Sequence, residues 1–290
     1  MTASPPYCRD AGSGPGVVCL HASASTSGQW RGLIELLAPA YQVYAPDLYD
    51  AGNGPHWPSQ RVIGLRDELA LIEPLLAKAG SPLALVGHSY GAAVALIAAL
   101  ANPDRVRALV LYEPTLFALL DAALPASAAT RDIRSTVADV SAALDAGDGD
   151  GAAARFVDYW TGAGTWKRMP EPRKAPIVAS VSNARRWAHA LFTEPTPLAA
   201  FRSLTMPVLC MTGTRSPASA LGVTRLLMAT LPHVELVEFE DLGHMGPVTD
   251  PATVNGVIAE FVEQHLAFYS AARCREEPCA CREAHDRSAP

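Results

Sequence analysis

The stretch from Leu83 to Leu96, with the sequence LALVGHSYGAAVAL, constrains the fold more than any other part of the chain. Its first four residues have the apolar composition of a short strand buried on both faces, and the run from Gly91 onward has that of a buried helix. Between them, Ser89 stands between two glycines in the pattern G-x-S-x-G. Because glycine has no Cβ, this pattern lets a strand turn sharply into a helix and expose the serine hydroxyl. A serine in this place can also cap the helix, by accepting a hydrogen bond from an early N–H.

Short apolar runs alternate with helical patterns along most of the chain. Strands are predicted at residues 17–20, 41–45, 83–86, 107–112, 208–212 and 234–239. Helices are predicted at residues 29–37, from 62 to 76 with a kink or an early end at Pro74, from 91 to 100, and from 251 to 268. This alternation implies parallel crossover connections. The predicted class is therefore α/β, with a doubly wound, mostly parallel sheet.

The alternation stops between residues 115 and 203, where a helical pattern is followed by many aromatic residues. Ligands of open parallel sheets bind beyond the carboxyl ends of the strands, so this insertion is predicted to be a helical cap over a pocket. The aromatic residues fit either the core of the cap or the lining of the pocket. We therefore expect a core domain at 1–114 and 204–270, a cap at 115–203, and a polar, disordered tail at 271–290.

Composition excludes several classes of partner. The net charge is −6 and no basic stripe is present, so we expect no nucleic acid partner. No run approaches the roughly 18 apolar residues of a membrane span, and the first residues do not resemble a signal peptide. We expect a cytoplasmic protein that acts on a small molecule. The sequence carries no signal for oligomeric state.

Three cysteines in the tail, Cys274, Cys279 and Cys281, stand near His285. Cysteine and histidine can bind zinc, but this spacing matches no familiar structural zinc site. A solvated tail explains the residues better, and we predict neither a metal site nor a cofactor.

Four motifs together resemble the α/β-hydrolase family, across residues 15 to about 268. They are LHASASTSGQW from residue 20, PDLYDAGNG from residue 46, GHSYG from residue 87 and DLGHMGP from residue 241. The resemblance implies that Ser89 is a nucleophile and that His244, in the loop after the last strand, is its general base. A histidine in a turn after a strand is the structural alternative for His244.

The acidic residue departs from the commoner pattern of that family, in which an aspartate follows the penultimate strand. Here that strand continues as VLCMTGTRSP, and the position holds Ser216. A less common arrangement places the acid at the end of the strand after the elbow helix, where this chain has LVLYEP. The resemblance then implies Glu113 as the acid, with Asp241 as the alternative.

The same resemblance implies an oxyanion hole made of two backbone N–H groups, from Tyr90 and Ser23. The family's usual His-Gly pair is His21-Ala22 here, which makes the conformation of this loop less predictable.

The predicted function is hydrolysis of a carboxylic ester, or a related acyl bond, of a small and partly apolar substrate through an acyl-enzyme. A serine at the elbow disfavours the haloalkane dehalogenase and epoxide hydrolase branches of the family, whose elbow carries aspartate. Two alternatives stay open, a cofactor-free haloperoxidase-like enzyme and a non-catalytic receptor for small molecules on the same fold.

Overall fold

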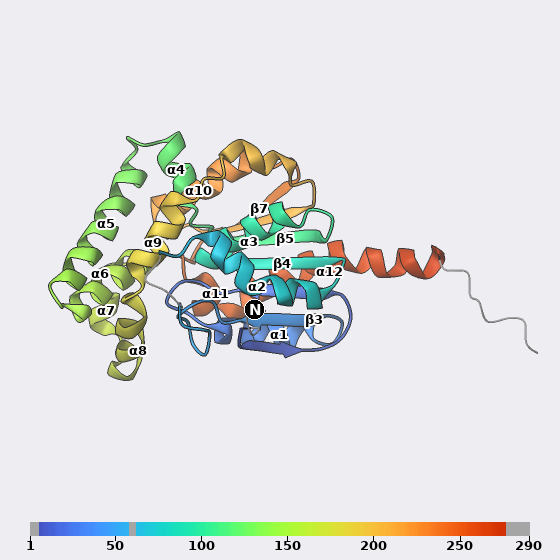
Figure 1. Ribbon diagram of the computed structural model, residues 1–290, viewed down its shortest axis with the longest axis horizontal. Coiled ribbons are helices and arrows are strands. Elements are labelled where there is room, and N and C mark those ends of the chain that lie inside the picture. Colours follow the sequence, from blue (N-terminus) through green and yellow to red (C-terminus); the bar gives the residue numbers. More distant parts are fainter. Residues whose placement is uncertain (1–5, 58–61, 277–290) are drawn as a thin grey trace, which may run out of the picture.

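A seven-stranded sheet forms the centre of the molecule (Figure 1), in a computed structural model that describes residues 6–57 and 62–276. The strand order is β1-β3-β2-β4-β5-β6-β7, with β1 antiparallel to β3 and all other pairs parallel. The strands are β1 Cys8–Ala11, β2 Gly16–Leu20, β3 Gln42–Pro46, β4 Leu83–His88, β5 Val106–Tyr112, β6 Val208–Gly213 and β7 Val234–Phe239. The predicted doubly wound, mostly parallel sheet is confirmed.

Helices cover both faces of this sheet because its central strands are apolar on both sides. In β4, Leu83 and Leu85 pack toward α2 Leu65–Ala79, α3 Tyr90–Ala101 and α10 Ala218–Met228. The alternate residues, Ala84 and Val86, pack toward α1 Arg31–Leu37 and α12 Pro251–Glu276. The period of two along the strand thus sends its side chains into two separate hydrophobic cores.

Three details differ from the sequence-based expectations. Strand β1 was not predicted, because this four-residue edge strand is only partly buried and has no apolar run. Helix α2 continues through Pro74 to Ala79 instead of ending early. Helix α12 extends past residue 268 to Glu276, so the first part of the predicted disordered tail, 271–276, is helical. That segment is rich in good helix formers although it lacks an apolar stripe. The tail from residue 277, with Cys279 and Cys281, lies outside the described residues.

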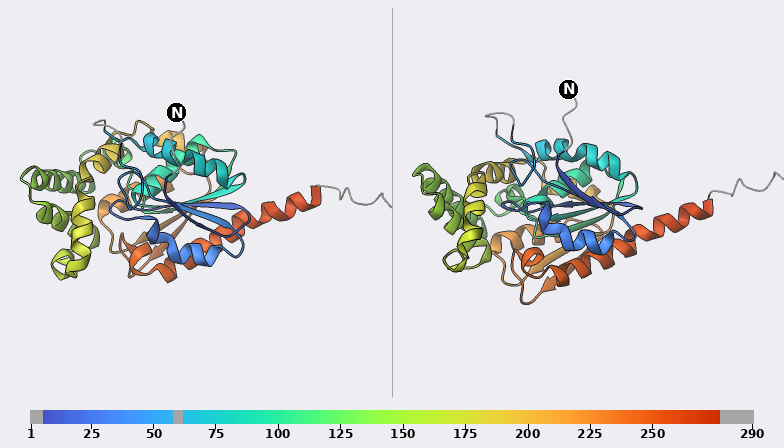
Figure 2. Two further views of the ribbon diagram at one scale, coloured as in Figure 1. Left: turned by 60° about the horizontal axis from the view of Figure 1, so that its bottom comes forward. Right: turned by 90° about the horizontal axis from the view of Figure 1, so that it is seen from below.

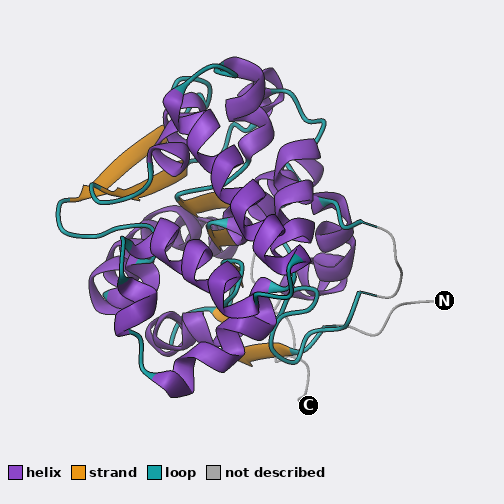
Figure 3. Cartoon of the chain, turned by 90° about the vertical axis from the view of Figure 1, so that its left-hand side faces the viewer, coloured by secondary structure: helices purple, strands orange, loops and turns teal. Residues whose placement is uncertain are grey.

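The insertion between β5 and β6 is helical. It contains α4 Phe117–Ala123, α5 Ala128–Asp145, α6 Gly149–Thr161, α7 Thr165–Arg168, α8 Glu171–Val181, α9 Ala184–Thr193 and the 3-10 helix η2 Leu198–Ser203. Most of these helices gather at one end of the molecule, and α12 runs out at the other end (Figure 2). Seen from that first end, they lie in front of the sheet (Figure 3). The exact division into core, cap and tail stays a prediction. Within 6–57 and 62–276, no helix has the length and hydropathy needed to cross a membrane.

Candidate active site

Ser89 lies at the turn between β4 and α3 in a strained backbone conformation, with φ 55° and ψ −115°. The flanking glycines permit this turn. A Cβ on Gly91 would lie 2.3 Å from the carbonyl oxygen of Leu20, and one on Gly87 would lie 2.5 Å from Cα of Ala92. The Ser89 side chain makes no capping hydrogen bond, so the helix-cap interpretation is wrong.

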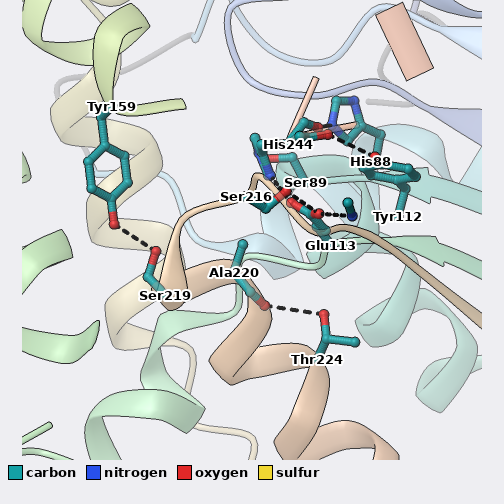
Figure 4. A network of polar contacts seen from close by, with 12 residues as sticks. His88, Ser89, Tyr112, Glu113, Tyr159, Ser216, Ser219, Ala220, Thr224 and His244 are labelled. Carbon is teal, nitrogen blue, oxygen red and sulfur yellow. Dashed lines mark hydrogen bonds and ion pairs between the residues drawn. The ribbon is translucent and has the colours of Figure 1, made fainter. Parts of the chain in front are cut away.

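The structure brings Ser89, His244 and Glu113 together (Figure 4). Ser89 Oγ lies 2.9 Å from His244 Nε2, and His244 Nδ1 lies 2.7 Å from Glu113 Oε2. All three residues are buried, with at most 3% of any of them exposed. Burial excludes most competing water, which strengthens both hydrogen bonds.

The carboxylate of Glu113 accepts two further hydrogen bonds. The backbone N–H of Gly213 donates to Oε1 at 2.7 Å, and the Ser216 hydroxyl donates to the same oxygen at 2.5 Å. Ser216 therefore contacts the carboxylate from the position where the commoner family pattern would have the aspartate. Asp241, the alternative acid, pairs with Arg215 at the surface, where its side chain is 84% exposed. In this structure the carboxylate at His244 is that of Glu113.

The loop that carries His244 is held by two residues that the sequence analysis did not assign to it. His88 Nε2–H donates to the backbone oxygen of His244 at 2.7 Å, and the Tyr112 hydroxyl donates to that of Gly243 at 2.8 Å. Burial, with the nearby His244 adding to it, lowers the pKa of His88 well below its ordinary value, so His88 is neutral. A polar side chain at the end of an apolar strand was the available signal for His88.

A tryptophan of the insertion covers the other side of His244. The ring of Trp160, on α6, stacks on the imidazole with centroids 4.1 Å apart and planes 30° apart. The aromatic residues of the insertion serve both roles considered above. Phe156, Trp160 and Trp187 line a cavity beside Ser89, whereas Trp166 is buried within the insertion.

The loop after β2 is fixed by hydrogen bonds around His21. Its Nδ1–H donates to the Ala22 oxygen at 2.8 Å, and its Nε2 accepts the N–H of Leu48 at 3.1 Å. Ala24 follows with φ 53°, a left-handed conformation that is uncommon for alanine. These contacts hold the loop that carries Ser23 beside Ser89, and both residues line the same cavity.

The two backbone N–H groups predicted for an oxyanion hole differ from that of Ala22 in their hydrogen bonding. The backbone N–H groups of Ser23 and Tyr90 donate to no acceptor among the described residues, whereas that of Ala22 donates to the Gln29 side chain. Tyr90 is further held through its hydroxyl, which donates to Glu68 at 3.1 Å. Glu68 is fully buried, and burial raises its carboxyl pKa to about 8.

Two hollows meet at Ser89. The narrow cavity lies between the end of β5 and the insertion, and its walls are mostly buried and apolar. It is lined by Ser23, Ser89, Thr115, Phe117, Ile133, Thr136, Val137, Val140, Ser141, Phe156, Trp160, Ala184, Trp187, Ala188 and Leu191. The wide groove is larger, and many of its walls are partly exposed. Its lining residues are Ala22, Ser23, Ala24, Ser25, Ser89, Phe156, Val157, Trp160, Thr161, Thr165, Met169, Arg173, Ile177, His244, Met245, Val248 and Thr249.

The strand order and the strained turn at Ser89 define an α/β-hydrolase fold. The sequence profile of the alpha/beta hydrolase fold family matches residues 15–251, and the chain belongs to this family. It is 28% identical over 252 residues to a pimeloyl-[acyl-carrier protein] methyl ester esterase of Aliivibrio salmonicida, an alignment that covers 82% of this chain and 88% of the esterase. A 37% identical match to lipase LipV of Mycobacterium tuberculosis covers 36% of this chain and 39% of the lipase.

Solved structures have the same fold. An alpha/beta hydrolase from Sphaerobacter thermophilus superposes with a TM-score of 0.68 at 25% identity, over 88% of this chain and 95% of that one. Epoxide hydrolase CorEH has a TM-score of 0.70 at 23% identity, over 89% and 94% of the two chains. Together, the family and its relatives support a hydrolase of this fold. Because esterases and epoxide hydrolases both occur among the relatives, the fold alone does not select the reaction.

Proposed function

We propose that this protein is a serine hydrolase that cleaves carboxylic esters through an acyl-enzyme intermediate. The chain of contacts from Glu113 through His244 to Ser89 supports the proposal most directly. A serine hydroxyl becomes a good nucleophile when a neighbouring base takes its proton. The carboxylate of Glu113 accepts the Nδ1–H of His244, so the unprotonated Nε2 faces Ser89. The same carboxylate stabilises the imidazolium that forms when Nε2 takes the serine proton.

In this mechanism His244 carries a proton in both directions. His244 takes the proton of Ser89 as Oγ attacks the ester carbonyl, and the new oxyanion accepts the backbone N–H groups of Tyr90 and Ser23. His244 next gives its proton to the leaving alcohol, which departs and leaves an ester on Ser89. Water attacks this acyl-enzyme by the same steps in reverse order. The acid and the alcohol leave the site, and His244 returns a proton to Ser89, so the enzyme is regenerated.

The identity of the nucleophile separates ester hydrolysis from epoxide opening. A carboxylate that opens an epoxide forms an ester, which water then cleaves. A serine that opened an epoxide would form an ether, which water does not cleave under mild conditions, so the enzyme would stop after one turnover. Ser89 at the elbow therefore favours acyl transfer over epoxide hydrolysis.

Covalent labelling tests the proposal. A fluorophosphonate probe should label the parent protein at Ser89, and Ser89→Ala should abolish both the labelling and the hydrolysis of p-nitrophenyl acetate. Phosphonylation needs an activated serine, so a receptor with a merely exposed serine stays unlabelled. Labelling without any ester turnover would favour the haloperoxidase-like alternative, which uses the same three residues.

A further inference from the structure

The narrow cavity and the wide groove share one border at the nucleophile. Ser23, Ser89, Phe156 and Trp160 line both, so a bound ester would extend into each hollow from the same point. For the reaction, the important difference is that His244 lines the wide groove and does not line the narrow cavity. This asymmetry fixes which half of an ester belongs on which side.

The leaving group must lie near His244, because that residue gives it a proton. The leaving alcohol therefore belongs in the wide groove, and the acyl group is left with the narrow cavity. We propose that the narrow cavity is the acyl site, and that the enzyme acts on esters of compact, mostly apolar acids and accepts large alcohols. This inference rests on the proposed ester hydrolysis at Ser89.

The lining of the narrow cavity specifies the acyl group further. Most of its walls are aliphatic or aromatic, among them Phe117, Ile133, Val140, Trp187 and Leu191, which are each at least nine-tenths buried. Such walls favour an aromatic or branched acyl group over a polar one. A long chain would have to displace packed side chains, which costs free energy.

Thr115 places a buried hydroxyl group, with no hydrogen-bond partner in the described part of the chain, in the wall of the narrow cavity. The hydroxyl oxygen of Thr115 is buried and makes no hydrogen bond among the described residues, and Thr115 is 0% exposed. Its backbone N–H faces the Ser89 carbonyl oxygen at 3.4 Å, so the residue lies close to the nucleophile. An unpaired buried hydroxyl destabilises the protein, and a ligand that forms a hydrogen bond with it removes this cost. The acyl group that fits best therefore carries one oxygen substituent close to its carbonyl carbon.

The wide groove offers a different environment to the alcohol. Thr161, Thr165 and Thr249 contribute hydroxyl groups to its walls, and Arg173 contributes a guanidinium group. These side chains are partly or fully exposed, so bound water can mediate their contacts. We therefore expect the wide groove to discriminate only weakly among alcohol groups.

Two ester series test the assignment. In the first, the alcohol is p-nitrophenol and the acid is acetic, phenylacetic or dodecanoic; in the second, the acid is phenylacetic and the alcohol grows from methanol to naphthylmethanol. We expect kcat/KM to fall at least about 100-fold from phenylacetate to dodecanoate, and to change by less than about tenfold across the alcohols beyond their intrinsic reactivity. The opposite result, with long acyl chains accepted and large alcohols rejected, would overturn the assignment.

A pair of matched variants places the effect in one hollow. Ala188 lines only the narrow cavity and Ile177 does not line it, so Ala188→Phe should lower the ratio of phenylacetate to acetate kcat/KM by about tenfold or more, and Ile177→Phe should not. If Ala188→Phe does not fold, Val137→Ala enlarges the same cavity and should raise the relative rate for larger acyl groups. Equal ratios in all variants would contradict the proposal.

The Thr115 contact has its own readout. The p-nitrophenyl esters of mandelic and phenylacetic acid differ by one hydroxyl group next to the carbonyl. We expect the parent to prefer the mandelate by about tenfold, Thr115→Val to bring the ratio to about 1, and Thr115→Ser to keep the preference. An unchanged ratio in Thr115→Val would refute the contact.

Absence of fluorophosphonate labelling at Ser89 would overturn the proposed function and this inference with it, whereas a labelled enzyme with reversed preferences would overturn the inference alone.

Discussion

Replacing Glu113 by Gln changes one atom of the side chain and tests the proposed acid directly. In the parent, the two carboxylate oxygens accept three hydrogen bonds, from His244, Gly213 and Ser216. The Gln amide has only one oxygen. If that oxygen stays with the N–H of Gly213 and the Ser216 hydroxyl, the amide NH2 group faces His244 Nδ1.

The consequence is a change of tautomer. Because Nδ1 of His244 then faces an N–H donor, it must accept that hydrogen bond, and the imidazole proton moves to Nε2. A protonated Nε2 cannot take the proton of the Ser89 hydroxyl. The negative charge that stabilises the imidazolium is lost as well. We expect kcat to fall by about 10³ to 10⁴, or about 4 to 5.5 kcal/mol of transition-state stabilisation, with little change in KM.

Steady-state hydrolysis of p-nitrophenyl phenylacetate, with thermal melting to verify the fold, measures this effect. Asp241→Asn is the matched control, because it also converts one carboxylate to an amide but at an exposed ion pair with Arg215, and it should cost less than about threefold. If Asp241→Asn lowered kcat strongly and Glu113→Gln lowered it only slightly, the reasoning would be refuted and the acid would lie in the His244 loop.

Three other variants probe the site. Ser89→Ala should lower kcat by about 10⁶ and leave the melting temperature within a few degrees, since only one hydroxyl is removed and the Cβ stays. Trp160→Leu should lower kcat about three- to tenfold and Trp160→Phe less, because the ring stacked on His244 stabilises the imidazolium; equal rates in all three proteins would contradict that role. Glu68→Gln tests the buried carboxyl, whose pKa is raised from 4.5 to about 8 in the folded state. Between these values the folded protein keeps the proton and the unfolded chain loses it, so the parent loses stability as the pH rises through this window, by up to about 5 kcal/mol above pH 8. Gln does not ionise, so its melting temperature relative to the parent should rise from pH 5 to pH 9; parallel curves would show that Glu68 is ionised in the fold.

The sequence was sufficient for most of the fold because the central strands are buried on both faces. Such strands appear as continuous apolar runs, as in β2 and β6. All six predicted strands agree with β2 to β7 within one or two residues, including the partly exposed edge strand β7. Strand β1 lacked that signal, since its four residues, CRDA, include two charged side chains and none of the four is fully buried at this edge of the sheet. Helix α12 also exceeded its prediction, because helix propensity continues after the apolar stripe ends.

The candidate site was only partly visible in the sequence. Ser89 and His244 stand in motifs that contain glycines with no room for a Cβ, namely Gly87, Gly91 and Gly246, so a short pattern marks them. Trp160 and His88 act on His244 across more than 80 residues of sequence, through stacking and a backbone hydrogen bond. No local pattern encodes such contacts. They depend on how the insertion packs over the sheet and on the path of the His244 loop.

The topology of the sheet explains why Glu113, and not a residue after β6, contacts His244. Strands β5 and β6 are parallel neighbours, with Tyr112 beside Met211 in register, so Glu113 ends its strand next to the end of β6. Neighbouring strands lie only about 4.8 Å apart, and the extra methylene of glutamate spans part of that distance. A carboxylate from either strand end can thus approach the same histidine. Ser216, just after β6, then donates a hydrogen bond to the carboxylate of Glu113 instead of supplying a carboxylate itself.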